Sequence, residues 1–272
     1  MILQSPKFFK IINEEKKIAE DLVDKLGIDV IISDNRFGFK SKKTINIFIC
    51  HQIHIQGPKL LMPIFFKINT YYIKQFDHCW IPDLKGKENL SGTLSSNPKP
   101  DNCSYIGPLT RFTKPANSKK HKYKYLAILS GPEPQRSLME SIVIKEFSCQ
   151  NNLCAIIGGK PDGNKYTKDN ITYFNHLETN KFFETVQSSE FLITRSGYSN
   201  IMDLSVLNKK VILIPTPGQT EQEYLAKYHS VKSNIKWFRQ SDFYLNGNND
   251  FGKIKSYNQG NLLEKEMSKI GL

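Results

Sequence analysis

The stretch of sequence that decides the fold class is FLITRSGYSNIMDLSVLNKKVILIPTPGQTEQEYLA, residues 191–226. Two short apolar runs in it, 191–194 and 211–214, each lead into a loop of small and polar residues, and a helical pattern follows each loop. Short apolar runs without polar alternation are typical of parallel strands that are buried on both faces of a sheet. The stretch therefore predicts two consecutive strand–loop–helix units.

The same alternation extends outward on both sides of this stretch. Further apolar runs that we expect to be strands lie at 28–33, 44–50, 79–83, 105–109, 125–129, 153–157 and 171–174. Helical patterns lie at 8–26, 60–73, 135–147, 180–188 and 261–270. This alternation predicts an α/β fold in which helices cover both faces of open parallel sheets.

A polar, basic segment that contains proline, residues 110–123, interrupts the alternation. Such segments are typical of the connection between two domains. We therefore expect a first Rossmann-like domain over 1–112, a linker over 113–123 and a second Rossmann-like domain over 124–272.

Composition narrows the class of protein. The chain has 272 residues, a formal net charge of +12 and five cysteines, and no Cys-x-x-Cys pair, which argues against a disulfide framework or a zinc site. A basic surface suits nucleic acid, an anionic membrane or a phosphorylated substrate, but the absence of a recognition helix or an aromatic stacking motif disfavours nucleic acid. No apolar run reaches the roughly 18 residues of a membrane span, and the start lacks a signal-peptide pattern. We expect a cytoplasmic protein that associates peripherally with the inner face of the membrane.

Three strand-to-helix loops in the second half carry the candidate ligand-binding residues, because ligands bind at the carboxyl ends of parallel strands. The first loop contains Ser130 and Gly131, and a helical pattern follows that includes Arg136. The free N–H groups at a helix start can hold a phosphate, with Arg136 as an added charge. An ordinary strand–helix turn is the alternative.

The second loop offers the small residues Ser196, Gly197 and Ser199 at a helix start, which again suits a diphosphate. Arg195 ends a buried strand, where a guanidinium rarely lies without an anionic partner. Asp203 falls inside the helix and could accept hydrogen bonds from ribose hydroxyls. The alternative is a capped helix with a surface salt bridge.

The third loop places Gln219, Glu221 and Gln222 directly after an apolar strand. Amides and carboxylates together supply the donors and acceptors that sugar hydroxyls require. The alternative is a polar helix start, because Thr220 and Glu223 could form a capping box.

Together the second and third loops, within residues 191–226, resemble the C-terminal domain signature of family 28 glycosyltransferases. This family includes the lipid-linked N-acetylglucosaminyl transferase of peptidoglycan synthesis, and the resemblance covers about residues 124–230. It implies a GT-B fold and a nucleotide-diphosphate sugar as donor, usually a UDP-sugar, with no further cofactor.

The resemblance also implies roles for individual residues. Asp203 stands where the family usually has a ribose-binding Glu, and Gln222 matches the Gln that contacts the donor sugar, with Glu221 before it. His176 lies where the family loop approaches the uracil, although a packing histidine is the alternative. The residues matched to the diphosphate-facing loops are Ser130, Gly131, Arg195, Ser196, Gly197 and Ser199. Leu225-Ala226 replaces the usual Asn-Ala, which leaves the identity of the donor sugar open.

In the first half, SDNRFG (33–38) and FICHQIHIQGP (48–58) resemble the N-terminal domain of predicted glycosyltransferases of this type. GT-B N-terminal domains normally open with a strand and a Gly-rich loop, whereas this chain opens inside a helix. We therefore expect an incomplete first domain that lacks on the order of 60–80 residues, and a last helix that packs back on that domain.

Inverting transfer needs a base for the acceptor hydroxyl. The candidates are Asp34, His51 and His54 at strand ends. The alternative is that Asp34 merely caps a turn and that the two histidines merely pack against their neighbours. No Asp-x-Asp triplet occurs, so we expect no metal site and metal-independent chemistry.

The sequence thus predicts a glycosyltransferase that moves a sugar from a UDP-sugar to a lipid-linked or saccharide acceptor. A nucleotide-sugar epimerase on the same fold is one alternative. A truncated subunit that binds a nucleotide sugar without turnover is the other.

Overall fold

The computed structural model describes residues 5–112, 121–160, 165–245, 251–255 and 260–271. The chain forms two compact units, Met1–Pro108 with Gln259–Leu272 and Leu109–Asn258. Residues 109–112, which we expected in the first domain, group with the second unit, whereas the last helix groups with the first unit. Of the predicted linker, residues 113–120 lie outside the described residues.

The first unit contains a four-stranded, entirely parallel sheet in the order β1-β2-β3-β4. Its elements are α1 (Ser5–Leu26), β1 (Val30–Asp34), β2 (Ile45–Ile49), α2 (Met62–Ile73), β3 (His78–Ile81), η2 (Gly86–Glu88), η3 (Gly92–Leu94), β4 (Cys103–Tyr105) and α7 (Leu262–Ser268). The core between α2 and the sheet is built from residues such as Phe48, Ile73 and Cys79, all fully buried. Full burial of one large apolar side chain stabilises a fold by roughly 1.5–3 kcal/mol.

One strand of the first unit lies earlier than predicted. The fourth strand was expected at 105–109, whereas β4 ends at Tyr105. Gly107 adopts φ 78°, in the left-handed region that ends extended backbone, and its N–H donates to the carbonyl of Asp83. The chain therefore turns where the apolar run continues.

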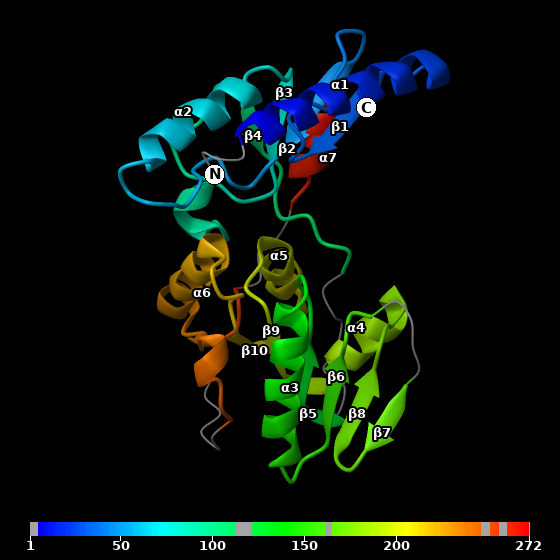
Figure 1. Ribbon diagram of the computed structural model, residues 1–272, viewed down its shortest axis with the longest axis vertical. Helices are drawn as coiled ribbons and strands as arrows, with labels where there is room; N and C mark the ends of the chain where they lie inside the picture. The colour runs from blue at the N-terminus through cyan, green and yellow to red at the C-terminus, as the bar shows by residue number, and fades with distance from the viewer. Residues whose placement is uncertain (1–4, 113–120, 161–164, 246–250, 256–259, 272) are drawn as a thin grey trace. The chain divides into compact units, whose positions relative to one another are not determined.

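The second unit is a seven-stranded sheet in the order β11-β10-β9-β5-β6-β8-β7, parallel except for β7 (Figure 1). Its strands are β5 (Tyr123–Ile128), β6 (Cys154–Ile157), β7 (Tyr166–Lys168), β8 (Ile171–Phe174), β9 (Ser189–Thr194), β10 (Lys210–Leu213) and β11 (Lys236–Trp237). Its helices are α3 (Gln135–Ser148), α4 (Thr179–Gln187), α5 (Tyr198–Leu207), α6 (Thr220–Ser233) and the short η4 (Gln240–Asp242). From β5 the chain first builds one side of the sheet and then returns to build the other. The neighbouring ends of β5 and β9 are therefore the switch point, where open α/β sheets bind ligands.

The core of the second unit explains why its strands are apolar throughout. Met139, Val143 and Phe147 of α3 pack against one face of the sheet, on which Ala127 and Ile193 lie (Figure 1). The alternate residues of the strands point to the opposite face and are also buried. Burial on both faces removes the polar alternation from the sequence, as predicted.

The α/β class and the parallel sheets were predicted correctly, but β7 and β11 were not predicted. All three residues of β7 are exposed, and β11 has two residues, so neither leaves an apolar run in the sequence. Among the described residues, no helix is both long and apolar enough to cross a bilayer.

Candidate functional site

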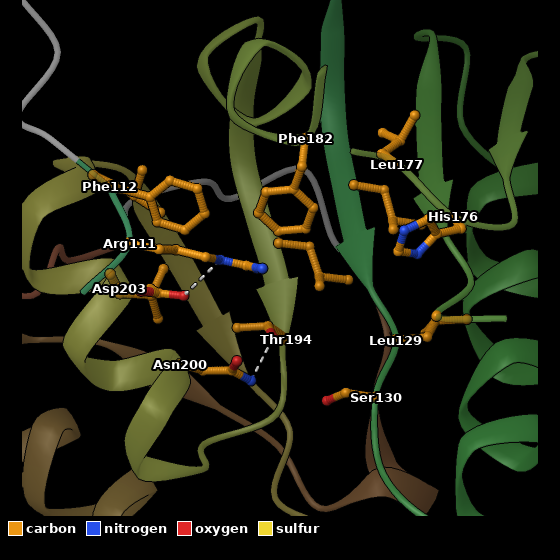
Figure 2. A pocket seen from close by; sticks show the side chains of 15 residues that line it. Arg111, Phe112, Leu129, Ser130, His176, Leu177, Phe182, Thr194, Asn200 and Asp203 are labelled. Carbon is orange, nitrogen blue, oxygen red and sulfur yellow. Dashed lines mark hydrogen bonds and ion pairs between the residues drawn. The ribbon is translucent and has the colours of Figure 1, made fainter. Parts of the chain in front are cut away.

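A cavity of about 230 Å³ lies at the switch point of the second unit, at the carboxyl ends of β9, β5, β6 and β8 (Figure 2). We call it the switch-point pocket. Its apolar walls include Leu129, Leu177 and Phe182, and its polar groups include Ser130, His176 and Asp203. An apolar slot with a few converging polar groups is the usual form of a site for a planar organic ligand.

Asp203 of α5 supplies the carboxylate of the switch-point pocket. Its Oδ1 accepts a hydrogen bond of 2.8 Å from the Thr110 hydroxyl. Its Oδ2 lies 3.8 Å from Nε of Arg111, the ion pair drawn in Figure 2. Burial raises the pKa of Asp203, and the Thr110 bond and the Arg111 charge oppose that rise. A carboxylate has about four acceptor positions, so the site retains capacity for hydroxyl donors of a ligand.

Residues just before the second sheet complete the wall beside Asp203. The ring of Phe112 stacks on Phe182 with centroids 5.6 Å apart, and the Arg111 guanidinium lies 4.8 Å and 4.9 Å from the two centroids. Sequence reasoning missed Thr110, Arg111 and Phe112 because it assigned them to the end of the first domain. The signal that could have found them is a Thr-Arg-Phe triplet between two sheets, which is weak alone.

The first predicted loop reaches the pocket through Ser130, and Gly131 beside it has φ 106°, which only glycine adopts readily. Arg136 does not line the pocket. Its nearly buried guanidinium binds Glu133 at 2.7 Å and Glu140 at 2.6 Å. Two carboxylates therefore already compensate the charge that we expected Arg136 to add for a phosphate.

Arg195 is fully buried, with 1% of its surface exposed. Its Nη1 donates to the carbonyls of Ile214 and Pro215 at 3.2 Å and 3.3 Å, and its Nη2 donates to the carbonyl of Gln135 at 2.9 Å and to Oε1 of Gln240 at 2.7 Å. Burial lowers the pKa of Arg195 to about 10. Carbonyl dipoles replace the anionic partner that we expected. The residue therefore joins the ends of β9 and β10 to the start of α3, instead of facing a ligand.

The second and third loops are held together by direct hydrogen bonds. The Ser196 hydroxyl donates to the carbonyl of Gln222 at 2.7 Å, and Oε1 of Gln222 accepts the N–H of Thr216 at 2.9 Å. Gly197 is the N-cap of α5 and offers no side-chain acceptor, while Ser199 is exposed in the first turn. The start of α5 therefore presents backbone N–H groups without a capping side chain, which suits an anion.

The third loop exposes Gln219, whose Oε1 accepts from Nε2 of Gln222, while Glu221 is half-buried. Gln219 is the N-cap of α6 and makes no side-chain capping bond. The N-cap of α6 is thus Gln219, one residue before the Thr220 of the alternative capping box. The structure thus brings together most predicted residues of loops two and three.

The predicted bases lie in the first unit. Asp34 is exposed at the end of β1, and His51 is half-buried after β2. His54 stacks on Phe66 with centroids 4.7 Å apart, and its Nε2 lies 3.0 Å and 2.9 Å from the carbonyls of Ser96 and Pro98. Those carbonyls require the proton on Nε2, so only Nδ1 of His54 could accept one.

A buried carboxylate organises the loop that holds His54. Asp83 is fully buried and accepts the N–H groups of Leu84 and Leu90 and both the N–H and the hydroxyl of Ser91. Its Oδ2 also accepts the Ser95 hydroxyl at 2.9 Å. No sequence signal marked Asp83, although the segment rich in Gly and Ser that follows it is where such a bonding pattern forms.

Comparison with known proteins finds a family model that matches most of the second unit. Residues 120–246 match the model of the glycosyltransferase family 28 C-terminal domain. No curated protein sequence matches the chain.

Solved structures extend the likeness to the fold of the whole chain. The glycosyltransferase of kitacinnamycin superposes with a TM-score of 0.56 at 12% identity, over 90% of this chain and 72% of that one. MurG from Acinetobacter baumannii gives 0.51 at 11% identity, over 97% and 71%. A putative UDP-N-acetylglucosamine 2-epimerase from Listeria monocytogenes gives 0.51 at 11%, over 97% and 70%. The predicted GT-B fold is confirmed by these superpositions.

Proposed function

Because residues 120–246 form a glycosyltransferase family 28 C-terminal domain on a GT-B fold, we propose that this protein transfers a sugar from a UDP-sugar to an acceptor hydroxyl. The observation that carries the proposal is the position of Asp203. Its carboxylate lines an apolar pocket at the switch point, on the helix whose uncapped start follows Ser196 and Gly197. A nucleoside and its diphosphate require this combination.

The pocket supports one binding mode for the donor. The pyrimidine lies between Leu129, Leu177 and Phe182 beside His176, and the ribose hydroxyls donate to Asp203. Thr110 and Arg111 hold that carboxylate in place. The diphosphate then lies between the loop of Ser130 with Gly131 and the start of α5 at Ser196 and Gly197. Gln219, Glu221 and Gln222 surround the sugar.

The transfer step breaks the bond between the anomeric carbon and the diphosphate oxygen and forms one to the acceptor oxygen. Negative charge develops on the departing diphosphate, and the backbone N–H groups at the start of α5 stabilise it. A base in the first unit removes the acceptor proton; Asp34, His51 and His54 remain the candidates. This mode of stabilisation requires no metal ion.

A surface of the first unit supports a lipid-linked acceptor at a membrane. Leu60, Ile64, Ile68 and Tyr71 on and before α2 are exposed by 91%, 51%, 48% and 65%. The exposed lysines among and beside them are Lys59, Lys67 and Lys74. An apolar helix face flanked by lysines is the pattern of a helix that lies in the surface of an anionic bilayer.

Calorimetric titration with UDP tests the donor site, and a separate titration with ADP is the control for specificity. We expect UDP to bind and Asp203→Asn to weaken binding, whereas the matched exposed variant Asp169→Asn should bind as the wild type does. A folded protein that does not bind UDP would overturn the assignment of the donor site. Incubation with UDP-N-acetylglucosamine alone separates the chemistries, because an epimerase interconverts its substrate without an acceptor and a transferase does not.

The membrane proposal has its own test. Cosedimentation with vesicles that contain anionic lipid should retain the wild-type protein, and the variant Ile64→Ser with Ile68→Ser should remain in the supernatant. Equal binding of both proteins would remove α2 from the membrane contact.

A further inference from the structure

A second cavity of the second unit, about 600 Å³ in volume, lies between α3 and α6 at the ends of β10 and β11. We call it the Trp237 pocket. It is larger than the switch-point pocket and shares no lining residue with it. Its lining residues take no part in the donor binding described above, although Pro217 and Gly218 belong to the loop that leads to Gln219.

Two cations line the Trp237 pocket without a carboxylate partner. Lys227 and Arg239 are exposed, and within the described part of the chain neither forms an ion pair. Glu223 also lines the cavity, but it is not paired with either cation in the described residues. The planar fork of an arginine and the ammonium group of a lysine both bind carboxylates and phosphates, and both line this cavity.

The remaining walls suit a sugar ring. The indole of Trp237 and the side chains of Leu138 and Ile142 provide apolar surface for the C–H face of a ring. Gln135, Glu223 and Ser241 provide donors and acceptors for its hydroxyls. Purely apolar ligands would leave these polar groups without partners, which costs free energy.

The floor of the pocket is fixed before any ligand enters. Gln240 has only 7% of its surface exposed. Its Oε1 accepts from Arg195 at 2.7 Å, and its Nε2 donates to Oε1 of Gln135 at 3.1 Å. Because Arg195 is itself held by three carbonyls, the polar groups of the floor keep one geometry. A preorganised site loses less conformational entropy when it binds.

We propose that the Trp237 pocket binds an anionic saccharide, a sugar that bears a carboxylate or a phosphate group, at a site separate from the donor nucleotide. The anionic group lies between Lys227 and Arg239, and the ring lies on Trp237. The loop at Pro217 and Gly218 leads directly into Gln219 and Gln222, so an occupant would contact the same loop as the donor sugar. The inference stands without the proposed reaction, because it depends on the cavity alone.

Tryptophan fluorescence reads this site directly, since the chain has two tryptophans and Trp80 is buried in the first unit. Glucuronate and glucose 1-phosphate are the probes, with methyl glucoside as the neutral control and inorganic phosphate as the sugar-free control. We expect one or both anionic sugars to change the emission with a Kd at or below about 10 mM, and Trp237→Phe to abolish the change. Lys227→Gln and Arg239→Gln should each weaken binding at least about tenfold, whereas the exposed control Lys181→Gln should not.

Several outcomes would overturn the proposal. They are an unchanged emission with both anionic sugars, an equal response to phosphate alone or to methyl glucoside, and full affinity in the Lys227→Gln, Arg239→Gln double variant. Displacement of the probe by UDP, or loss of its binding in Asp203→Asn, would place it in the donor site and also refute a separate pocket. Binding of UDP itself is measured in parallel, so a failed donor site and a failed Trp237 pocket give different results.

Discussion

Replacement of Arg195 by methionine should destabilise the second unit strongly, because the guanidinium bonds to acceptors from three separate segments of that unit. The guanidinium makes four hydrogen bonds, three of them to backbone carbonyls, and it is 1% exposed. A hydrogen bond from a charged donor contributes about 1.5–3 kcal/mol, so the loss of four would exceed 5 kcal/mol. The methionine variant also avoids the free-energy cost of burying the Arg195 charge without a carboxylate partner, which offsets part of this loss. We expect a net loss of about 3–4 kcal/mol, which lowers the melting temperature of a unit of this size by roughly 6–15 °C.

Differential scanning calorimetry measures the melting temperature, and UDP titration well below it measures donor affinity. Arg195→Lys should fall between the wild type and Arg195→Met in stability, because one ammonium cannot reach all four acceptors. Its UDP affinity should stay within about tenfold of the wild type, since the group positions loops and does not contact the diphosphate. A variant with an unchanged melting temperature and a lost UDP affinity would refute this reasoning and return Arg195 to direct contact.

Three further perturbations follow from single contacts. Asp203→Asn should weaken UDP binding by about 10- to 100-fold in calorimetry, because it removes the charge from a hydrogen-bonded acceptor; unchanged affinity would exclude a ribose contact. Burial lowers the pKa of Lys209 from 10.5 to about 8 in the folded state. Between those values the unfolded chain keeps a proton that the folded one has lost, so stability rises with pH there. In denaturant titrations, the free energy of unfolding of the wild type should therefore rise by about 1–3 kcal/mol relative to that of Lys209→Met between pH 8 and 10.5. The same pH dependence of stability in both proteins would contradict the lowered pKa. Gly158→Ala would place a Cβ 2.3 Å from the Tyr173 hydroxyl and should lower the free energy of unfolding by about 1–3 kcal/mol. Adding Tyr173→Phe should restore part of that loss. A double-mutant cycle that shows no coupling between the two substitutions would exclude the clash.

Local patterns in the sequence predicted the parallel strands and the loaded loops because both depend on neighbouring residues. A strand buried on both faces leaves an apolar run, and a helix start that faces an anion leaves small residues before it. Ser196, Gly197 and Gln222 could be assigned to loops on this basis, and the structure joins those loops through the bond from Ser196 to Gln222.

The partners of charged side chains could not be predicted, because they come from distant parts of the chain. Arg195 meets Gln240 across 45 residues, and Thr110 meets Asp203 across 93. Sequence alone assigned Arg195 a ligand because a buried guanidinium needs acceptors, and it could not show that backbone carbonyls supply them. The ion pairs of Arg136 with Glu133 and Glu140 could not be predicted from the sequence either.

The contact between Thr110 and Asp203 links donor binding to the segment that opens the second unit. The Thr110 hydroxyl and the Arg111 guanidinium both approach the carboxylate on which we place the ribose. A ligand that donates hydrogen bonds to this carboxylate therefore changes the free energy of the contacts made by 110–112. Linkage is reciprocal, so the conformation of these residues must in turn alter donor affinity. If the ribose binds Asp203 as proposed, the segment next to the second sheet is part of the donor site in energetic terms, even where it makes no contact with the nucleotide.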